Sequence, residues 1–144
     1  MTIIYTIGFT KKSAEEFFKT LQEAGVKKII DIRLWNHSVY AGFTNIRDFP
    51  YLLKLHDIEY SHVVDFAPTK EILNDYKNEV NDWEEYEKRY IELLNHRKIL
   101  NRVKESQFDG ACLLCAEPTA EQCHRRLLAE YLQQHFKDIE IKHL

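Results

Sequence analysis

The chain has 144 residues, a formal net charge of −3 and a pI near 6.2, a size that fits one compact domain over residues 1–144. The missing basic excess argues against a sequence-independent binder of duplex DNA, although a local basic cleft would still allow nucleic-acid contact. No apolar run approaches the roughly 20 residues that span a bilayer, and the first residues lack the pattern of a signal peptide. We therefore expect a cytoplasmic protein without membrane contact, whose three cysteines stay reduced.

Short β-rich runs alternate with helical stretches along the chain. Strands are predicted at 3–7, 28–32, 59–63, 110–115 and 139–143. Helices are predicted behind capping boxes or caps at Ser13, Thr69, Asp82 and Thr119, and over 49–56. This alternation predicts a three-layer, Rossmann-like α/β domain with a mostly parallel sheet of about five strands. Because the longest connection lies between the third and fourth strands, we expect the strand order 3-2-1-4-5.

That order places the first and fourth strands side by side at the topological switch point, where open α/β sheets bind ligands. Cys115 and Glu117 follow the fourth strand, and Cys123, His124 and Arg125 lie in the helix predicted behind Thr119. A helix N-terminus attracts anions, and an arginine adds bidentate recognition of phosphate or carboxylate. We therefore expect an anionic ligand at this edge of the sheet.

Each of these residues also has a structural interpretation. Glu117 is a candidate general acid or base, or an ion-pair partner of Arg125. Cys123 and His124 are candidates for nucleophilic or proton-transfer chemistry, yet their helical phase points both toward the packed face. Cys112 lies three residues before Cys115 and is expected to pack on the opposite face of the strand.

Further candidates precede this region. Asp31 and Arg33 end the second strand on one side, where they would orient a substrate or form a structural salt bridge. The loop over 35–43 is rich in aromatic and hydrogen-bonding residues, including Ser38, and would stack on a base or a sugar or pack as a lid. A single glycine, Gly8, follows the first strand, so the G-x-G-x-x-G fingerprint of a dinucleotide site is missing and no cofactor is predicted.

Spacing limits the cysteine chemistry. A phosphatase or rhodanese-like loop would need arginine six residues after Cys115, where Glu121 stands. A metal site built on Cys115, Cys123 and His124, with Glu117 or His143, matches none of the usual ligand spacings. The leading prediction therefore has no metal, and the metal or thiol site stays an alternative.

The chain resembles the domain of unknown function 488 (DUF488) family across nearly its whole length. The resemblance rests on a set of short motifs: Thr6-Ile-Gly8, Asp31-Ile-Arg33, Ser38, Gly42-Phe43, Tyr60-Ser-His62, Ala67-Pro-Thr69, Asp82-Trp83, Tyr86, Tyr90, Leu113-Leu-Cys-Ala-Glu117, Cys123-His-Arg125 and His143-Leu144. The family usually has a histidine and a small hydroxyl residue after the opening glycine. Here Phe9 and Thr10 follow it, so the hydroxyl is kept, but Phe9 neither transfers a proton nor binds a metal. The resemblance implies a fold and a site rather than a reaction.

Taken together, we predict an enzyme or ligand-binding domain for a phosphorylated or nucleotide-like anionic substrate. The catalytic candidates are Glu117, His124 and Cys123, and the substrate-binding candidates are Arg125, Asp31, Arg33, Ser38 and Thr10. A non-catalytic binding or regulatory module is the alternative, beside the metal or thiol site. The expected partner is a small anionic or nucleotide-like molecule.

Overall fold

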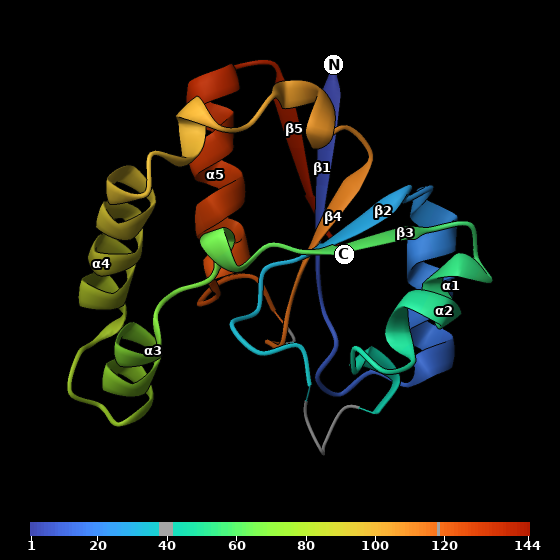
Figure 1. The fold of residues 1–144 in the computed structure, drawn as a ribbon, viewed down its shortest axis with the longest axis horizontal. Helices are drawn as coiled ribbons and strands as arrows, with labels where there is room; N and C mark the ends of the chain where they lie inside the picture. Colours follow the sequence, from blue (N-terminus) through green and yellow to red (C-terminus); the bar gives the residue numbers. More distant parts are fainter. Residues whose placement is uncertain (38–41, 118) are drawn as a thin grey trace.

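A computed structural model describes residues 1–37, 42–117 and 119–144 of the chain. It confirms a three-layer α/β domain with a five-stranded, all-parallel sheet, shown in Figure 1. The strands are β1 (Thr2–Gly8), β2 (Lys28–Asp31), β3 (Glu59–His62), β4 (Ala111–Cys115) and β5 (Ile139–His143). Each lies within a residue or two of its predicted position.

Helices cover both faces of this sheet. On one face lie α1 (Ala14–Ala24) and α2 (Phe49–Lys54), and on the other lie α3 (Lys70–Lys77), α4 (Trp83–His96) and α5 (His124–Phe136), as Figure 1 shows. In the described ranges, short 3-10 helices lie in the connections at Gly42–Thr44, Val64–Phe66, Ile99–Asn101 and Glu105–Gln107. None of the helices in the described part of the chain has the length and apolarity needed to cross a membrane.

Three of the predicted helix starts are confirmed by their caps. The side chains of Ser13, Thr69 and Asp82 each accept a hydrogen bond from the backbone N–H three residues further on. These bonds satisfy N–H groups that have no partner within the helix. Gly25 ends α1 with φ of 76°, a left-handed conformation that glycine adopts without steric cost.

The predicted start of the last helix is wrong. The capping box at Thr119 is not used, and α5 begins at His124 with Cys123 as its N-cap. The chain first folds back behind β4, so that the carbonyl oxygen of Glu117 accepts a hydrogen bond from Arg125. This turn occupies the residues that the capping box would have placed in a helix.

The order of two central strands also differs from the prediction. The sheet runs β3-β2-β4-β1-β5, so β4 rather than β1 occupies the centre. All five residues of β4 are buried, whereas β1 begins with two partly exposed residues. A strand that is apolar throughout suits the position that helices cover on both faces. Strands β1 and β4 still pair directly, but in this order the connections that diverge are those from β2 to β3 and from β4 to β5, so the switch point lies between β2 and β4.

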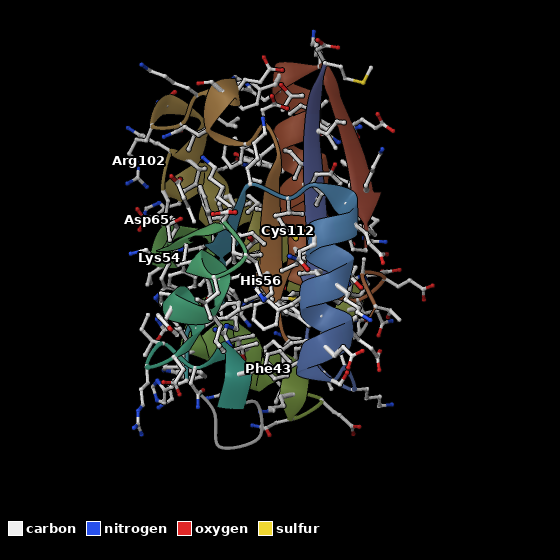
Figure 2. All side chains as sticks on the ribbon, turned by 90° about the vertical axis from the view of Figure 1, so that its right-hand side faces the viewer. Phe43, Lys54, His56, Asp65, Arg102 and Cys112 are labelled. Carbon is white, nitrogen blue, oxygen red and sulfur yellow. A yellow bond between two sulfur atoms is a disulfide. The ribbon has the colours of Figure 1, made fainter. Side chains whose placement is uncertain are left out.

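The core consists of two hydrophobic clusters, one on each side of the sheet. Leu113 and Cys115 of β4 face α4 and α5, and Cys112 and Leu114 face α1 and α2. In Figure 2, which looks onto the face of the sheet that α1 and α2 cover, the label of Cys112 stands between these two helices. The alternating direction of side chains along a strand thus separates Cys112 from Cys115 despite their C-x-x-C spacing.

Gly8 ends β1 where the chain after β4 crosses closest to it. A Cβ atom at this position would overlap the carbonyl oxygen of Glu117 and lie 2.5 Å from Nη1 of Arg125. Only glycine therefore allows the loop after β1 and the loop after β4 to approach each other this closely.

We expect Gly8→Ala to lower the free energy of unfolding by about 2–3 kcal/mol, because the loop after β4 must move away. The matched control is Gly42→Ala, since no atom lies within 4 Å of a Cβ built there. Its effect should stay below about 1 kcal/mol. Urea unfolding of both variants measures the difference, and equal stabilities would contradict the proposed close approach.

Candidate functional site at the carboxyl edge of the sheet

A cavity of about 350 Å³ opens at the carboxyl ends of β1, β2 and β4. Four aromatic residues line it, namely Phe9, Trp35, Tyr76 and Tyr86. Its charged and reactive lining comes from Arg33, His37, Lys77, Cys115, Glu117, Cys123 and His124. The cavity therefore brings together one substrate-binding candidate and all three catalytic candidates from the sequence.

A second cavity, of about 230 Å³, lies along β2 and β3 and contains none of the predicted site residues. Asp65 and Arg102, both labelled in Figure 2, are among its lining residues and form an ion pair at 2.7 Å. Its other walls are mainly aliphatic and aromatic. The cavity at the carboxyl edge is therefore the one that holds the candidate chemistry.

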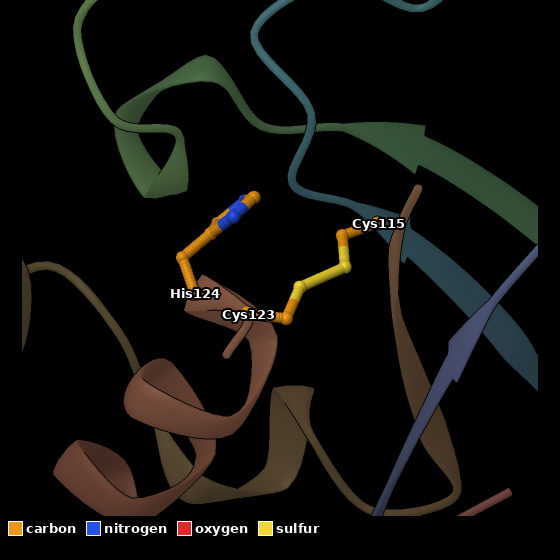
Figure 3. Close-up of side chains that lie close together, drawn as sticks. All are labelled: Cys115, Cys123 and His124. Atoms are coloured by element: carbon orange, nitrogen blue, oxygen red, sulfur yellow. A yellow bond between two sulfur atoms is a disulfide. The ribbon is translucent and has the colours of Figure 1, made fainter. Parts of the chain in front are cut away.

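Cys115 and Cys123 meet at the floor of the main cavity. Cys115 ends β4 and Cys123 caps α5, and a disulfide joins their sulfur atoms, as Figure 3 shows. The expectation that all three cysteines are reduced is therefore wrong for this pair in the structure, and Cys112 is a free thiol. The Cα atoms of Cys115 and Cys123 are 7.5 Å apart, outside the usual 4.4–6.8 Å range for disulfides. One ring nitrogen of His124 lies within 4.8 Å of both sulfur atoms.

The imidazole ring of His124 forms a hydrogen bond with the backbone of Ile32. Its Nε2 lies 2.8 Å from the carbonyl oxygen of Ile32, and because a carbonyl only accepts, Nε2 carries the proton. Burial lowers the pKa of the imidazole to about 4, although the bond to Ile32 opposes this shift. His124 is therefore neutral at pH 7 and keeps a lone pair on Nδ1.

Arg125 is almost completely buried, at 1% exposure, and does not line the cavity. Its guanidinium donates to Thr6 Oγ1 at 3.2 Å, to the carbonyl oxygen of Glu117 at 2.6 Å and to Cys115 Sγ at 3.4 Å. Burial lowers the pKa of Arg125, while the negative charge of Glu117 opposes that shift. The residue thus ties β1, β4 and α5 together behind the cavity, and its predicted contact with a substrate stays a prediction.

Asp31 and Arg33 form a salt bridge, which is the structural alternative to a role in orienting a substrate. Nη2 of Arg33 lies 2.7 Å from Oδ2 of Asp31, and both side chains are buried. Tyr60 also donates to Asp31 at 2.7 Å, and Arg33 donates to Thr44. The guanidinium carbon of Arg33 lies 5.2 Å from the ring centre of Phe9, and these two side chains form part of the cavity wall.

The remaining candidates lie in different surroundings. Glu117 has an exposed side chain in the cavity lining, and its carboxylate makes no salt bridge within the described part of the chain. Thr10 is exposed outside the cavity lining, and its backbone N–H donates to the carbonyl of Ala116. Ser38 lies outside the described residues. The structure therefore brings Arg33, Glu117, Cys123 and His124 together, and leaves Thr10 apart from them.

Helix α3 supplies three cavity residues that the sequence did not indicate, Leu73, Tyr76 and Lys77. The hydroxyl of Tyr76 donates to the side chain of Gln122, joining α3 to the loop before α5. Burial and the charge of Glu117 raise the pKa of Tyr86, so its phenol stays protonated as a donor. The helical spacing of Tyr86 indicated only a core position, and no signal in the sequence placed α3 at this edge.

A three-layer α/β domain with a ligand-sized cavity at its switch point is the class that this fold and site define. The model of the family described as "Domain of unknown function DUF488" matches residues 13–132. The match covers most of the chain, and the protein belongs to the DUF488 family. No curated protein and no solved structure matches it.

We expect Arg125→Met to lower the free energy of unfolding by about 2–4 kcal/mol, because the carbonyl of Glu117 and the hydroxyl of Thr6 lose their buried donor. Arg47→Met is the matched control, since the side chain of Arg47 is 91% exposed. Its effect should stay within about 0.5 kcal/mol. Chemical denaturation compares the two, and a fully stable Arg125→Met variant would show that Arg125 does not hold the site together.

Proposed function

We propose that the cavity at the carboxyl edge binds a small, planar, anionic molecule of the nucleotide type and acts on it. The observation that carries this proposal is the meeting of aromatic rings, cationic groups and reactive side chains in one cavity at the switch point. Its volume of about 350 Å³ falls in the usual range for small-molecule sites.

The aromatic residues support a planar ligand. Trp35 is half exposed at the cavity, and Phe9 and Tyr86 are buried in its wall. A base stacked on such a ring gains about 1–3 kcal/mol, with little dependence on its identity. The rings come from three separate segments of the chain, so the ligand would be enclosed rather than held on one surface.

The cationic groups support an anion. Lys77 has an exposed ammonium at the end of α3, and its charge is free of any ion pair within the described ranges. The N-terminus of α5 reaches the same cavity through Cys123 and His124, and Cys123 makes no side-chain cap bond. The positive end of the helix dipole therefore adds to Lys77.

In this proposal, Glu117 is the acid or base, since its carboxylate is exposed in the lining. Cys123 and His124 present sulfur and an imidazole nitrogen to the same ligand. Arg33 contributes a guanidinium to the cavity wall, and the carboxylate of Asp31 neutralises its positive charge. A binding module without catalysis would use the same contacts and would release the ligand unchanged.

Titration calorimetry with AMP, adenosine, ribose 5-phosphate and inorganic phosphate tests the proposal on the full chain. We expect AMP to bind more tightly than adenosine or phosphate alone, because the cavity offers both rings and cations. Thermal unfolding should shift upward with AMP by mass action. No binding of any of the four at millimolar concentration would overturn the proposal, and product analysis after incubation separates an enzyme from a binding module.

Two variants locate the binding site. Lys77→Ala should weaken AMP binding by about tenfold through loss of the ammonium, and Trp35→Ala by a similar factor through loss of stacking. Lys88→Ala removes an exposed ammonium of α4 outside the cavity and should bind AMP like the wild type. Equal affinities in all three variants would mean that the ligand binds elsewhere.

A further inference from the structure

Three side chains of metal-ligand type converge at the floor of the cavity. The sulfur atoms of Cys115 and Cys123 and one ring nitrogen of His124 all lie within 4.8 Å of one another, and all three residues are buried. They come from two elements, the end of β4 and the start of α5, as Figure 3 shows. Two sulfurs and an imidazole form a donor set that zinc prefers.

His124 has the orientation that a metal ligand requires. Its Nε2–H is fixed by the carbonyl oxygen of Ile32 at 2.8 Å, which leaves Nδ1 as the free donor. Histidines that bind metals almost always donate their other ring N–H to a carbonyl, a carboxylate or water. The partner carbonyl belongs to the backbone directly after β2, so the rigid sheet sets the angle of the ring.

The backbone spacing of the two cysteines suits a shared ion. Their Cα atoms are 7.5 Å apart, farther than the 4.4–6.8 Å that is usual for a disulfide. Two thiolates bound tetrahedrally to zinc, each about 2.3 Å from the ion, hold their sulfurs about 3.8 Å apart. Because that separation is wider than a sulfur–sulfur bond, it suits Cα atoms that are this far apart.

The charge behind the site also favours thiolates. Nη1 of Arg125 lies 3.4 Å from Cys115 Sγ, and no carboxylate of the described residues lies within 4 Å of this guanidinium. Once the disulfide is reduced, the sulfur of Cys115 lies within hydrogen-bond reach of this buried cation, which stabilises the thiolate over the thiol. Thiolate is the form of cysteine that binds metals.

We propose that, once a thiol reductant has opened the disulfide to two thiols, Cys115 and Cys123 lose their protons and bind one zinc ion together with His124, with its fourth coordination position open to the cavity. Three protein ligands and one open position distinguish catalytic zinc sites from structural ones, which are closed by four. All three ligands line the cavity, so water or a ligand has access to the ion. The site does not depend on an anionic ligand, and its metal is measured without any nucleotide present.

The test begins with the full chain purified under reducing conditions without chelator. Elemental analysis should give about one zinc per chain, and cobalt titration of the metal-free protein should produce the thiolate charge-transfer and visible bands of tetrahedral Co²⁺. Thiol titration in denaturant with chelator should find all three cysteines free. A chain without stoichiometric zinc or a thiolate–cobalt band, with Cys112 as its one free thiol, would overturn the proposal in favour of a disulfide.

Variants with the same chemical change identify the ligands. Cys115→Ala and Cys123→Ala should each weaken cobalt binding at least about a hundredfold and reduce the charge-transfer band, and His124→Ala should also weaken it. Cys112→Ala is the matched control, because this buried thiol lies on the other face of β4 and should leave the spectrum unchanged. A band of undiminished intensity and affinity in Cys123→Ala, or the loss of the band in Cys112→Ala, would overturn the assignment. Failure of AMP binding with zinc present would overturn the proposed function alone.

Discussion

The guanidinium of Arg125 joins β1, β4 and the loop after β4 to α5 behind the cavity. It reaches the hydroxyl of Thr6 in β1, the sulfur of Cys115 in β4 and the carbonyl of Glu117 in the following loop, while its own backbone belongs to α5. Gly8 leaves room for these contacts, because any side chain there would occupy the space of Glu117 and Arg125. The buried guanidinium of Arg125 and the absence of a side chain at Gly8 therefore set the position of the cavity floor.

This arrangement separates the groups that position the site from those that face it. Arg125 and the pair of Asp31 and Arg33 are buried and bonded to protein groups, as expected for charges removed from water. Glu117 and Lys77 remain exposed in the cavity lining and form no salt bridge among the described residues. A ligand at this edge would therefore meet a carboxyl group and an amino group beside the buried sulfur atoms and imidazole.

The sequence predicted local features well and their spatial combination less well. Strand positions and the caps at Ser13, Thr69 and Asp82 depend on neighbouring residues, and all are confirmed. The predicted start of α5 is wrong: the helix begins at His124, and the carbonyl of Glu117 accepts a long-range hydrogen bond from Arg125 that the local sequence does not indicate. At the site, the convergence of Cys123, His124 and Glu117 followed from the switch point. The contribution of α3 did not, since it depends on how a distant helix pair packs.

The central position of β4 has a consequence for how the chain folds. Strands β1 and β2 do not pair with each other, and both pair with β4. Strand β4 lies late in the sequence, at residues 111–115. Until these residues are available, β2 can pair with β3 alone, and β1 has no completed neighbour because β5 comes later still. Closing such distant contacts costs loop entropy before it is rewarded, which slows folding. A ribosome-bound chain would thus hold most of its sheet unformed until nearly four-fifths of it had been synthesised.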